Sequence, residues 1–211
     1  MADYLEPYRK AVADGGATFE SLLWKNRDYQ QLRFAVFADS IDLTGRVVAD
    51  MGCGRADLAV WLHAQGIEFG GYVGVEGVAE LAAAAREEIA QHGIDSCEIV
   101  EADFAADSEL AASLVRSRGV DTILFSGSLN TFDEDDAIAV LERTFAALSR
   151  GGVLAFNFLS DQRREPRAAT GPANRFDTVR LTAWALKQTE SVVLRHDYLR
   201  DHDATIVMRS V

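Results

Sequence analysis

The residues best suited to hold a ligand lie in a short stretch where an acid precedes two closely spaced glycines. Val47 to Asp50 is an apolar run that ends in this acid, and Gly52 and Gly54 follow it. The pattern predicts a buried strand, a tight turn and a helix from about Ala56. Because glycine lacks a Cβ, the turn can adopt positive φ and lie against a ligand, while free N–H groups of the helix face that ligand.

The residues around the turn distinguish between the ligands that such turns bind. A dinucleotide site of the Gly-x-Gly-x-x-Gly type needs a small residue at the third glycine position, close to the pyrophosphate. This chain has Asp57 there, and Asp50 stands two residues before the first glycine. Carboxylates repel phosphates and attract amines, so the pattern counts against NAD or FAD. It favours a ligand with a cationic amine, and S-adenosylmethionine carries one.

This stretch and three later segments resemble, in order, the motifs of class I S-adenosylmethionine-dependent methyltransferases. Asp50 to Gly54 is similar to their Asp-x-Gly-x-Gly motif, which places Cys53 in the cofactor loop. Tyr72 to Glu76 resembles their second strand. The resemblance implies that Glu76, with its two acceptor oxygens, binds both ribose hydroxyls and that Gly77 leaves space for them.

Two further segments extend the resemblance to the adenine and the methyl group. Glu98 to Phe104 resembles the third strand and the Asp-Phe pair after it, which implies that Asp103 binds the exocyclic amine and Phe104 lies beside the ring. Asp121 to Asn130 resembles the fourth strand and the loop that faces the methyl group. Ser126 ends this strand, and Asn130 is a candidate contact in the loop. The loop lacks the Pro-Pro-Tyr of enzymes that methylate amino groups of DNA or glutamine.

The composition is that of an acidic globular chain, and its charge favours a small-molecule substrate over a nucleic acid. The chain has 211 residues, of which 48% are hydrophobic, and a formal net charge of −12. The excess of acids argues against a nucleic-acid partner, which clustered Lys and Arg would hold. No apolar run is long enough to span a membrane, and the acidic first residues do not resemble a signal peptide, so we expect no membrane partner and a cytoplasmic protein. The oligomeric state stays open, a homodimer included.

The order of predicted elements indicates the fold. After residue 45, strands alternate with helices, which is the pattern of a parallel sheet covered on both faces. We expect strands at 46–51, 71–76, 97–101, 120–126 and 152–158, and helices at 56–65, 78–92, 107–117 and 134–149. A helix at 178–187 and strands at 191–199 and 204–211 follow. The prediction is a Rossmann-like, doubly wound α/β fold, and the resemblance implies a mostly parallel seven-stranded sheet with a closing antiparallel hairpin.

Residues 1–44 precede this expected methyltransferase domain, 45–211, and carry helical patterns of apolar residues. Two interpretations remain open for them. In one, their aromatic side chains plug an edge of the core. In the other, they form a helical lid over the cofactor, and Tyr29 and Arg33, one helical turn apart, reach it, with Arg33 pairing to the methionine carboxylate.

The sequence assigns no catalytic residue and no metal. Methyl transfer from a sulfonium asks mainly for alignment and exclusion of water, with a base only if the acceptor must lose a proton. Asp133 and Glu134 are better explained as an N-cap and a first-turn acid. The cluster of His and acid residues comprises His196, Asp197, Asp201, His202 and Asp203. Strand alternation would place His196 and Asp197 on opposite faces, which disfavours a shared metal ion.

Two side-chain groups remain without a clear chemical role. Cys53 and Cys97 are too few for a disulfide framework, so we expect free thiols. The polar segment 161–175 carries a group of arginines that either meets an acidic acceptor or forms a solvated loop. That group consists of Arg163, Arg164, Arg167 and Arg175.

Together these observations predict an S-adenosylmethionine-dependent methyltransferase that acts on an O, N or C atom of a small-molecule acceptor and releases S-adenosylhomocysteine. One alternative is an NAD(P)-dependent Rossmann oxidoreductase, which shares the strand, the glycine turn and the ribose-binding acid. The other is a non-catalytic S-adenosylmethionine-binding protein that acts by interaction. A titration that compares binding of NADH with binding of S-adenosylhomocysteine distinguishes the oxidoreductase from the methyltransferase. Binding of the cofactor without methyl transfer across a broad screen of acceptors would favour the non-catalytic protein.

Overall fold

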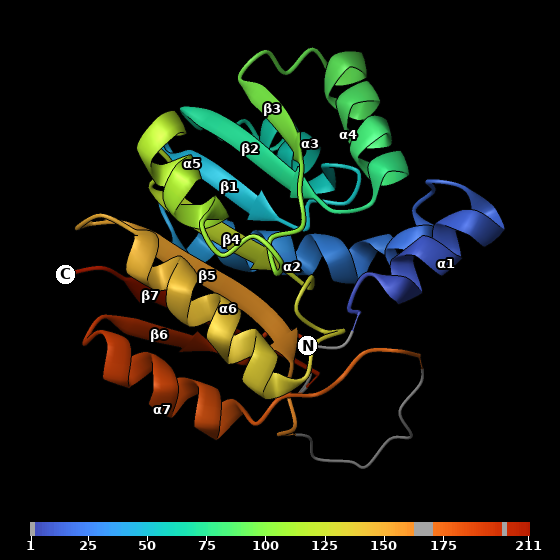
Figure 1. The fold of residues 1–211 in the computed structure, drawn as a ribbon. Helices are drawn as coiled ribbons and strands as arrows, with labels where there is room; N and C mark the ends of the chain where they lie inside the picture. The colour runs from blue at the N-terminus through green and yellow to red at the C-terminus, as the bar shows by residue number, and fades with distance from the viewer. Residues whose placement is uncertain (1–2, 163–170, 200–201) are drawn as a thin grey trace.

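A seven-stranded sheet with helices on both faces makes up the part of the chain that the structure describes (Figure 1). This computed structural model describes residues 3–162, 171–199 and 202–211. The strands are β1 (Val47–Met51), β2 (Gly71–Glu76), β3 (Cys97–Glu101), β4 (Thr122–Ser126), β5 (Val153–Leu159), β6 (Val192–Arg195) and β7 (Asp203–Arg209). The helices are α1 (Glu6–Gly15), α2 (Arg27–Ser40), α3 (Asp57–Ala64), α4 (Ala79–His92), α5 (Leu110–Arg118), α6 (Glu134–Ala147) and α7 (Thr178–Gln188), with a 3-10 helix η1 (Glu20–Leu22).

The topology of the sheet confirms the predicted fold class. The strand order is β3-β2-β1-β4-β5-β7-β6. Strands β1 to β5 are parallel, and β7 inserts antiparallel between β5 and β6. Connections from β1 run outward in opposite directions on its two sides, through β2 and through β4. A crevice therefore opens beyond the carboxyl ends of these strands, where α/β proteins of this kind bind their ligands.

Both faces of the sheet are buried, which explains why its strands read as nearly continuous apolar runs. Helices α2, α3 and α4 cover one face, and α5, α6 and α7 cover the other (Figure 1). Successive side chains point to opposite layers, as Ile123 and Leu124 do on β4. No helix within the described ranges is long and apolar enough to cross a membrane.

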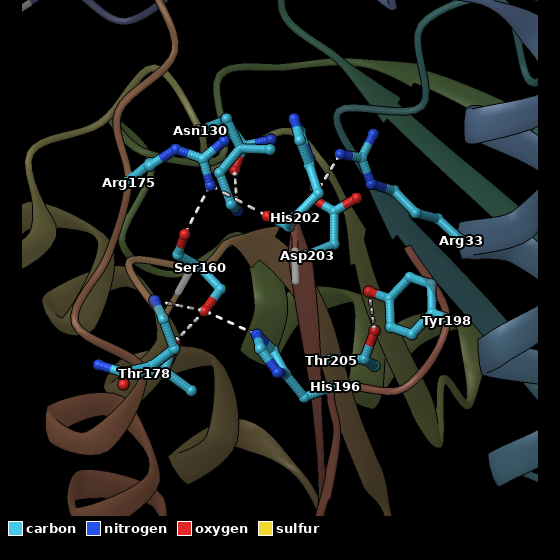
Figure 2. A network of polar contacts seen from close by, with 12 residues as sticks. Arg33, Asn130, Ser160, Arg175, Thr178, His196, Tyr198, His202, Asp203 and Thr205 are labelled. Carbon is cyan, nitrogen blue, oxygen red and sulfur yellow. Dashed lines mark hydrogen bonds and ion pairs between the residues drawn. The ribbon is translucent and has the colours of Figure 1, made fainter. Parts of the chain in front are cut away.

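Helix α2 is fastened to the last strand of the chain, β7, by a buried ion pair. Arg33 Nη2 donates to Asp203 Oδ1 at 2.6 Å, and both side chains are almost fully buried. The Arg33 guanidinium also lies over the ring of Trp24, 4.4 Å from the ring centroid. Figure 2 shows the arginine reaching from α2 to the first residue of β7. The pair thus fixes a helix that precedes the sheet to its last inserted strand.

The C-terminal hairpin differs from the prediction in its first strand. Strand β6 ends at Arg195 instead of continuing to residue 199, and β7 begins one residue early, at Asp203. The Asp197 carboxylate accepts from Arg195 Nε at 2.7 Å in a local turn. The alternation argument for His196 and Asp197 is therefore wrong, because neither residue belongs to a strand.

The start of α6 also differs from the prediction. Asp133 occupies the N-cap position, but its side chain makes no capping hydrogen bond. Glu134 instead accepts from the backbone N–H of Asp177 at 2.6 Å and pairs with Arg180 at 2.7 Å. The first-turn acid therefore links α6 to α7 in addition to any effect on the helix dipole.

We expect Asp203→Leu to lower the free energy of unfolding by about 3–5 kcal/mol, because it leaves the buried Arg33 charge without its partner. The double variant Arg33→Met, Asp203→Leu removes both charges and should recover most of this loss. Arg180→Ala, at an exposed ion pair, serves as the control and should cost less than about 1 kcal/mol. Urea unfolding measures all three. A double variant no more stable than Asp203→Leu would contradict the assignment.

Candidate functional site

A cavity opens at the carboxyl ends of β1, β2 and β4, where the order of the sheet reverses. Its empty space, which includes part of the open solvent at its mouth, is about 650 Å³. Eight of the residues predicted from the sequence line it. They are Asp50, Gly52, Cys53, Gly54, Glu76, Gly77, Phe104 and Ser126.

The glycine turn after β1 contributes shape to this cavity. Gly52 and Gly54 have φ of +79° and +57°, and a Cβ on Gly52 would lie 2.5 Å from the Cβ of Ser128. Only glycine fits both the conformation and the space. The N–H groups of Gly52 and Cys53 both donate to the carbonyl of Val75, at 2.8 and 2.9 Å. These donors are not free for a ligand, which makes the turn a poor cradle for a diphosphate.

Glu76, at the end of β2, is fixed to the wall of the cavity by two backbone hydrogen bonds. Its Oε2 accepts from Gly54 N and its Oε1 from Val78 N, each at 2.9 Å. Burial raises the pKa of this carboxyl to about 7, although the N–H donors act to lower it. Each oxygen keeps a second lone pair. The carboxyl group is therefore held in one orientation with acceptor capacity left for a ligand.

Asp50, at the end of β1, has an unpaired oxygen in the cavity wall. Its Oδ2 accepts from the Tyr72 hydroxyl at 2.7 Å, whereas its Oδ1 is buried without a hydrogen-bond partner. Burial, against the lowering effect of the Tyr72 hydrogen bond and with the help of the carboxylates of Glu76 and Asp57, raises the pKa of Asp50 to about 7. An unpaired buried acceptor destabilises the protein until something donates to it. A cationic amine would supply both the missing donor and the missing charge.

Asp103 and Phe104 lie beside one another at the edge of the cavity, joined to the N-terminal segment. Asp103 Oδ1 accepts from the Tyr4 hydroxyl at 2.8 Å and from the N–H groups of Ala105 and Ala106. The Phe104 ring stacks on Phe132 with centroids 5.9 Å apart, and Tyr4 packs against both rings. Phe104 lines the cavity, and Asp103 does not.

Three predicted residues have other roles in the structure. The guanidinium of Arg33, expected at the methionine carboxylate, is engaged by Asp203 (Figure 2). The Tyr29 ring has the Lys25 ammonium 5.0 Å from its centroid and makes an edge contact with His202. Asn130 Oδ1 accepts from Leu159 N at 3.2 Å and ties the loop after β4 to β5. None of the three lines the cavity.

The N-terminal segment supplies lining residues that the sequence prediction missed. Tyr4 lies just before α1 and Tyr8 in its first turn, and Gln30 and Phe34 come from α2. Gln30 Nε2 donates to Asp57 Oδ2 at 2.8 Å, so α2 touches the start of α3. Gln30 and Phe34 have the i, i+4 spacing of one helix face, which was a usable signal in the sequence.

The His and acid cluster is dispersed into structural contacts (Figure 2). His196 Nε2 lies 2.9 Å from Ser160 Oγ, which also contacts Thr178 Oγ1 at 2.7 Å. Arg175 donates to the carbonyl oxygens of Ser160 and His202. Asp201, Arg163, Arg164 and Arg167 lie outside the described residues. Among the described residues no group of three His, Cys, Asp or Glu could hold a metal ion, and both cysteines are free thiols.

Comparison with known proteins finds a family for the residues that supply much of the cavity wall. Residues 48–152 match the family model described as "Methyltransferase domain". The chain is similar to an O-methyltransferase family protein from Burkholderia thailandensis, with 18% identity and a TM-score of 0.67, over 86% of this chain and 56% of that one. It is similar to the S-adenosylmethionine-dependent methyltransferase SibL in its apo form, with 17% identity and a TM-score of 0.70, over 99% of this chain and 70% of that one.

A third similar structure is the glycopeptide N-methyltransferase MtfA complexed with S-adenosylmethionine, with 13% identity and a TM-score of 0.62, over 86% of this chain and 94% of that one. The chain thus spans little more than half of the Burkholderia protein and nearly all of MtfA. No curated protein matches the sequence. At such low identities the structural likeness establishes the fold.

We expect the ligand-free protein to lose stability as the pH rises from about 4 to about 7. The pKa of Asp50 is near its ordinary value of 3.8 in the unfolded chain but near 7 in the folded protein, so over this interval the folded state binds more protons. The variant Asp50→Asn has no carboxyl group to ionise at this position, so it lacks the part of the stability loss that Asp50 causes. The stability advantage of the variant over the wild type should grow between pH 4 and pH 7 and level off above. Urea unfolding at several pH values measures it, and a pH-independent advantage would contradict the burial argument.

Proposed function

We propose that the protein is a class I S-adenosylmethionine-dependent methyltransferase, that its cavity binds S-adenosylmethionine and that it methylates an O, N or C atom of a small molecule. The match of residues 48–152 to the methyltransferase-domain model supports this proposal. The observation that carries this proposal is the unpaired Oδ1 of Asp50 in the cavity wall, next to a turn of bare backbone. An amino-acid nucleoside offers an ammonium group for this oxygen and no diphosphate for the turn to hold.

The other lining groups match the remaining parts of this cofactor. The fixed carboxyl of Glu76 suits two vicinal hydroxyls, since each oxygen keeps a free lone pair. Phe104 gives an aromatic surface for the adenine, and Asp103 beside it is an acceptor for the exocyclic amine. These assignments cover the amine, the ribose and the adenine, but not the methionine carboxylate, because Arg33 is engaged by Asp203.

The protein has mainly to align the two reactants and keep water away. The sulfonium of the cofactor supplies the activated methyl group. Tyr4, Tyr8 and Trp24 line the cavity from residues 1–44, so we propose that this segment covers the bound cofactor as a helical lid. The cover would exclude water from the methyl group and contribute part of the acceptor site.

The oxidoreductase alternative has little physical support. The N–H groups of the glycine turn are bonded within the protein, and Asp57 stands where a pyrophosphate would approach. Both features disfavour a dinucleotide. The similar structures include an O-methyltransferase family protein and a glycopeptide N-methyltransferase, so the likeness leaves the acceptor atom open.

We expect Glu76→Ala and Asp103→Ala each to weaken binding of S-adenosylhomocysteine by about 1–3 kcal/mol, the cost of losing a hydrogen bond to a buried or charged group. Isothermal titration calorimetry measures the affinity. Glu101→Ala is the matched control, because Glu101 ends the next strand, β3, with an exposed side chain and should change little.

A wild-type protein that binds NADH and not S-adenosylhomocysteine would overturn the proposed function. Unchanged affinity in both site variants would leave the function standing but overturn the residue assignment. Circular dichroism of each variant confirms that a loss of binding does not come from unfolding.

A further inference from the structure

A row of buried polar atoms without hydrogen-bond partners extends from the cavity under helix α2. Ser126 Oγ, at the end of β4, lines the cavity and has no partner. On β5, both the Oδ1 and the Nδ2 of Asn157 are unpaired, although this side chain is fully buried. Arg33 Nε and Asp203 Oδ2 are unpaired as well, although another atom of each forms their ion pair.

The strand register places these side chains next to one another. Ser126 is directly opposite Asn157, and Asn157 is directly opposite Thr205 on β7. Opposed residues on neighbouring strands point to the same face, and Asp203, two residues before Thr205, shares that face. This face belongs to the layer in which Phe34 and Phe37 of α2 pack against Val207.

Thr205, which neighbours Asn157 on this face, differs from it because the Thr205 side chain has a hydrogen-bond partner. The hydroxyl of Thr205 is 2.7 Å from the hydroxyl of Tyr198, so its hydrogen bond is made within the protein (Figure 2). The amide of Asn157 has no such partner on either atom. Unpaired buried polar atoms destabilise a folded protein and are rare. Four residues with such atoms on one face indicate a place where a ligand supplies the missing partners.

The charges in the row indicate the chemical class of that ligand. Arg33 and Asp203 neutralise each other across 2.6 Å, and Asn157 and Ser126 are uncharged. A charged ligand group would be buried without a counter-charge, which is costly. The unpaired atoms include donors and acceptors, and a hydroxyl is the small neutral group that both donates and accepts.

The row begins in the wall of the cavity. Ser126 and Trp24 both line the cavity, and the Trp24 ring lies under the guanidinium of Arg33. We propose that Ser126, Asn157, Arg33 and Asp203 form a subsite that binds a neutral hydroxyl group of the acceptor. This inference rests on the proposed function, since it assumes that the cavity holds the methyl donor.

The first test uses the stability of the ligand-free protein. Asn157→Leu keeps the volume of the side chain and removes the unpaired amide, so the melting temperature should rise by about 2–4 °C. Thr205→Val, the neighbouring isosteric change, leaves the Tyr198 hydroxyl unpaired and should lower the melting temperature. If Asn157→Leu also lowers it, the amide is satisfied in the free protein and the proposal is overturned.

The second test measures binding to protein saturated with S-adenosylhomocysteine. The probes are benzyl alcohol, benzylamine and benzoate, which share a ring and differ in charge. We expect benzyl alcohol to bind about tenfold more tightly than either charged probe, and Asn157→Leu to abolish this preference without changing the affinity for S-adenosylhomocysteine. Thr205→Val should keep the preference. Titration followed by two-dimensional NMR gives the dissociation constants.

The outcomes separate the subsite from the proposed function. Failure of the wild type to bind S-adenosylhomocysteine would count against the function itself. Normal binding of S-adenosylhomocysteine, combined with no binding of benzyl alcohol or with tighter binding of benzylamine or benzoate, would overturn the hydroxyl subsite alone. A preference for benzyl alcohol that persists in Asn157→Leu would overturn it too.

Discussion

The organisation of the site depends on carboxyl groups that are buried where the sheet reverses its order. Asp50 and Glu76 end neighbouring parallel strands, and burial raises the pKa of both to about 7. The protein provides two N–H donors for Glu76 and one hydroxyl for Asp50, and Asp50 Oδ1 remains unpaired. The glycine turn exists in this form because Gly54 must donate to Glu76 while Gly52 leaves room for Ser128. The free site is therefore under electrostatic strain that a cationic ligand would relieve.

A second buried charge pair determines how the site is enclosed. Arg33 and Asp203 join α2 to β7, and the same helix brings Gln30 and Phe34 to the cavity. Replacing such a pair with apolar residues often costs little stability, so its value lies in fixing one packing arrangement of the helix. In the proposed subsite the unpaired atoms that remain on both partners would also meet the ligand. Enclosure and recognition would then share one face of the sheet.

The sequence predicted the features that depend on local patterns. Asp50, Glu76 and the glycines after β1 lie where a strand, an acid and a turn residue follow directly along the chain, so their positions could be inferred without partners. Arg33 could not be placed in this way, because its partner Asp203 is 170 positions away. The sequence likewise placed Asn130 at the ligand, whereas its side-chain amide oxygen accepts a hydrogen bond from the backbone N–H of Leu159 on β5. Tertiary packing determines which partner such a polar side chain has when that partner is distant in the sequence. No local sequence pattern predicts this choice.

The sequence separation of the Arg33–Asp203 pair also has a consequence for biosynthesis. Helix α2 emerges from the ribosome early, but its buried guanidinium has no counter-ion until β7 has been made and inserted between β5 and β6. In a nascent chain that ends before β7, only the apolar side chains of α2 could pack the helix against the sheet. Closing such a distant contact is slow. The ion pair that fixes the α2 wall of the cavity can therefore form only after the final strands have been translated.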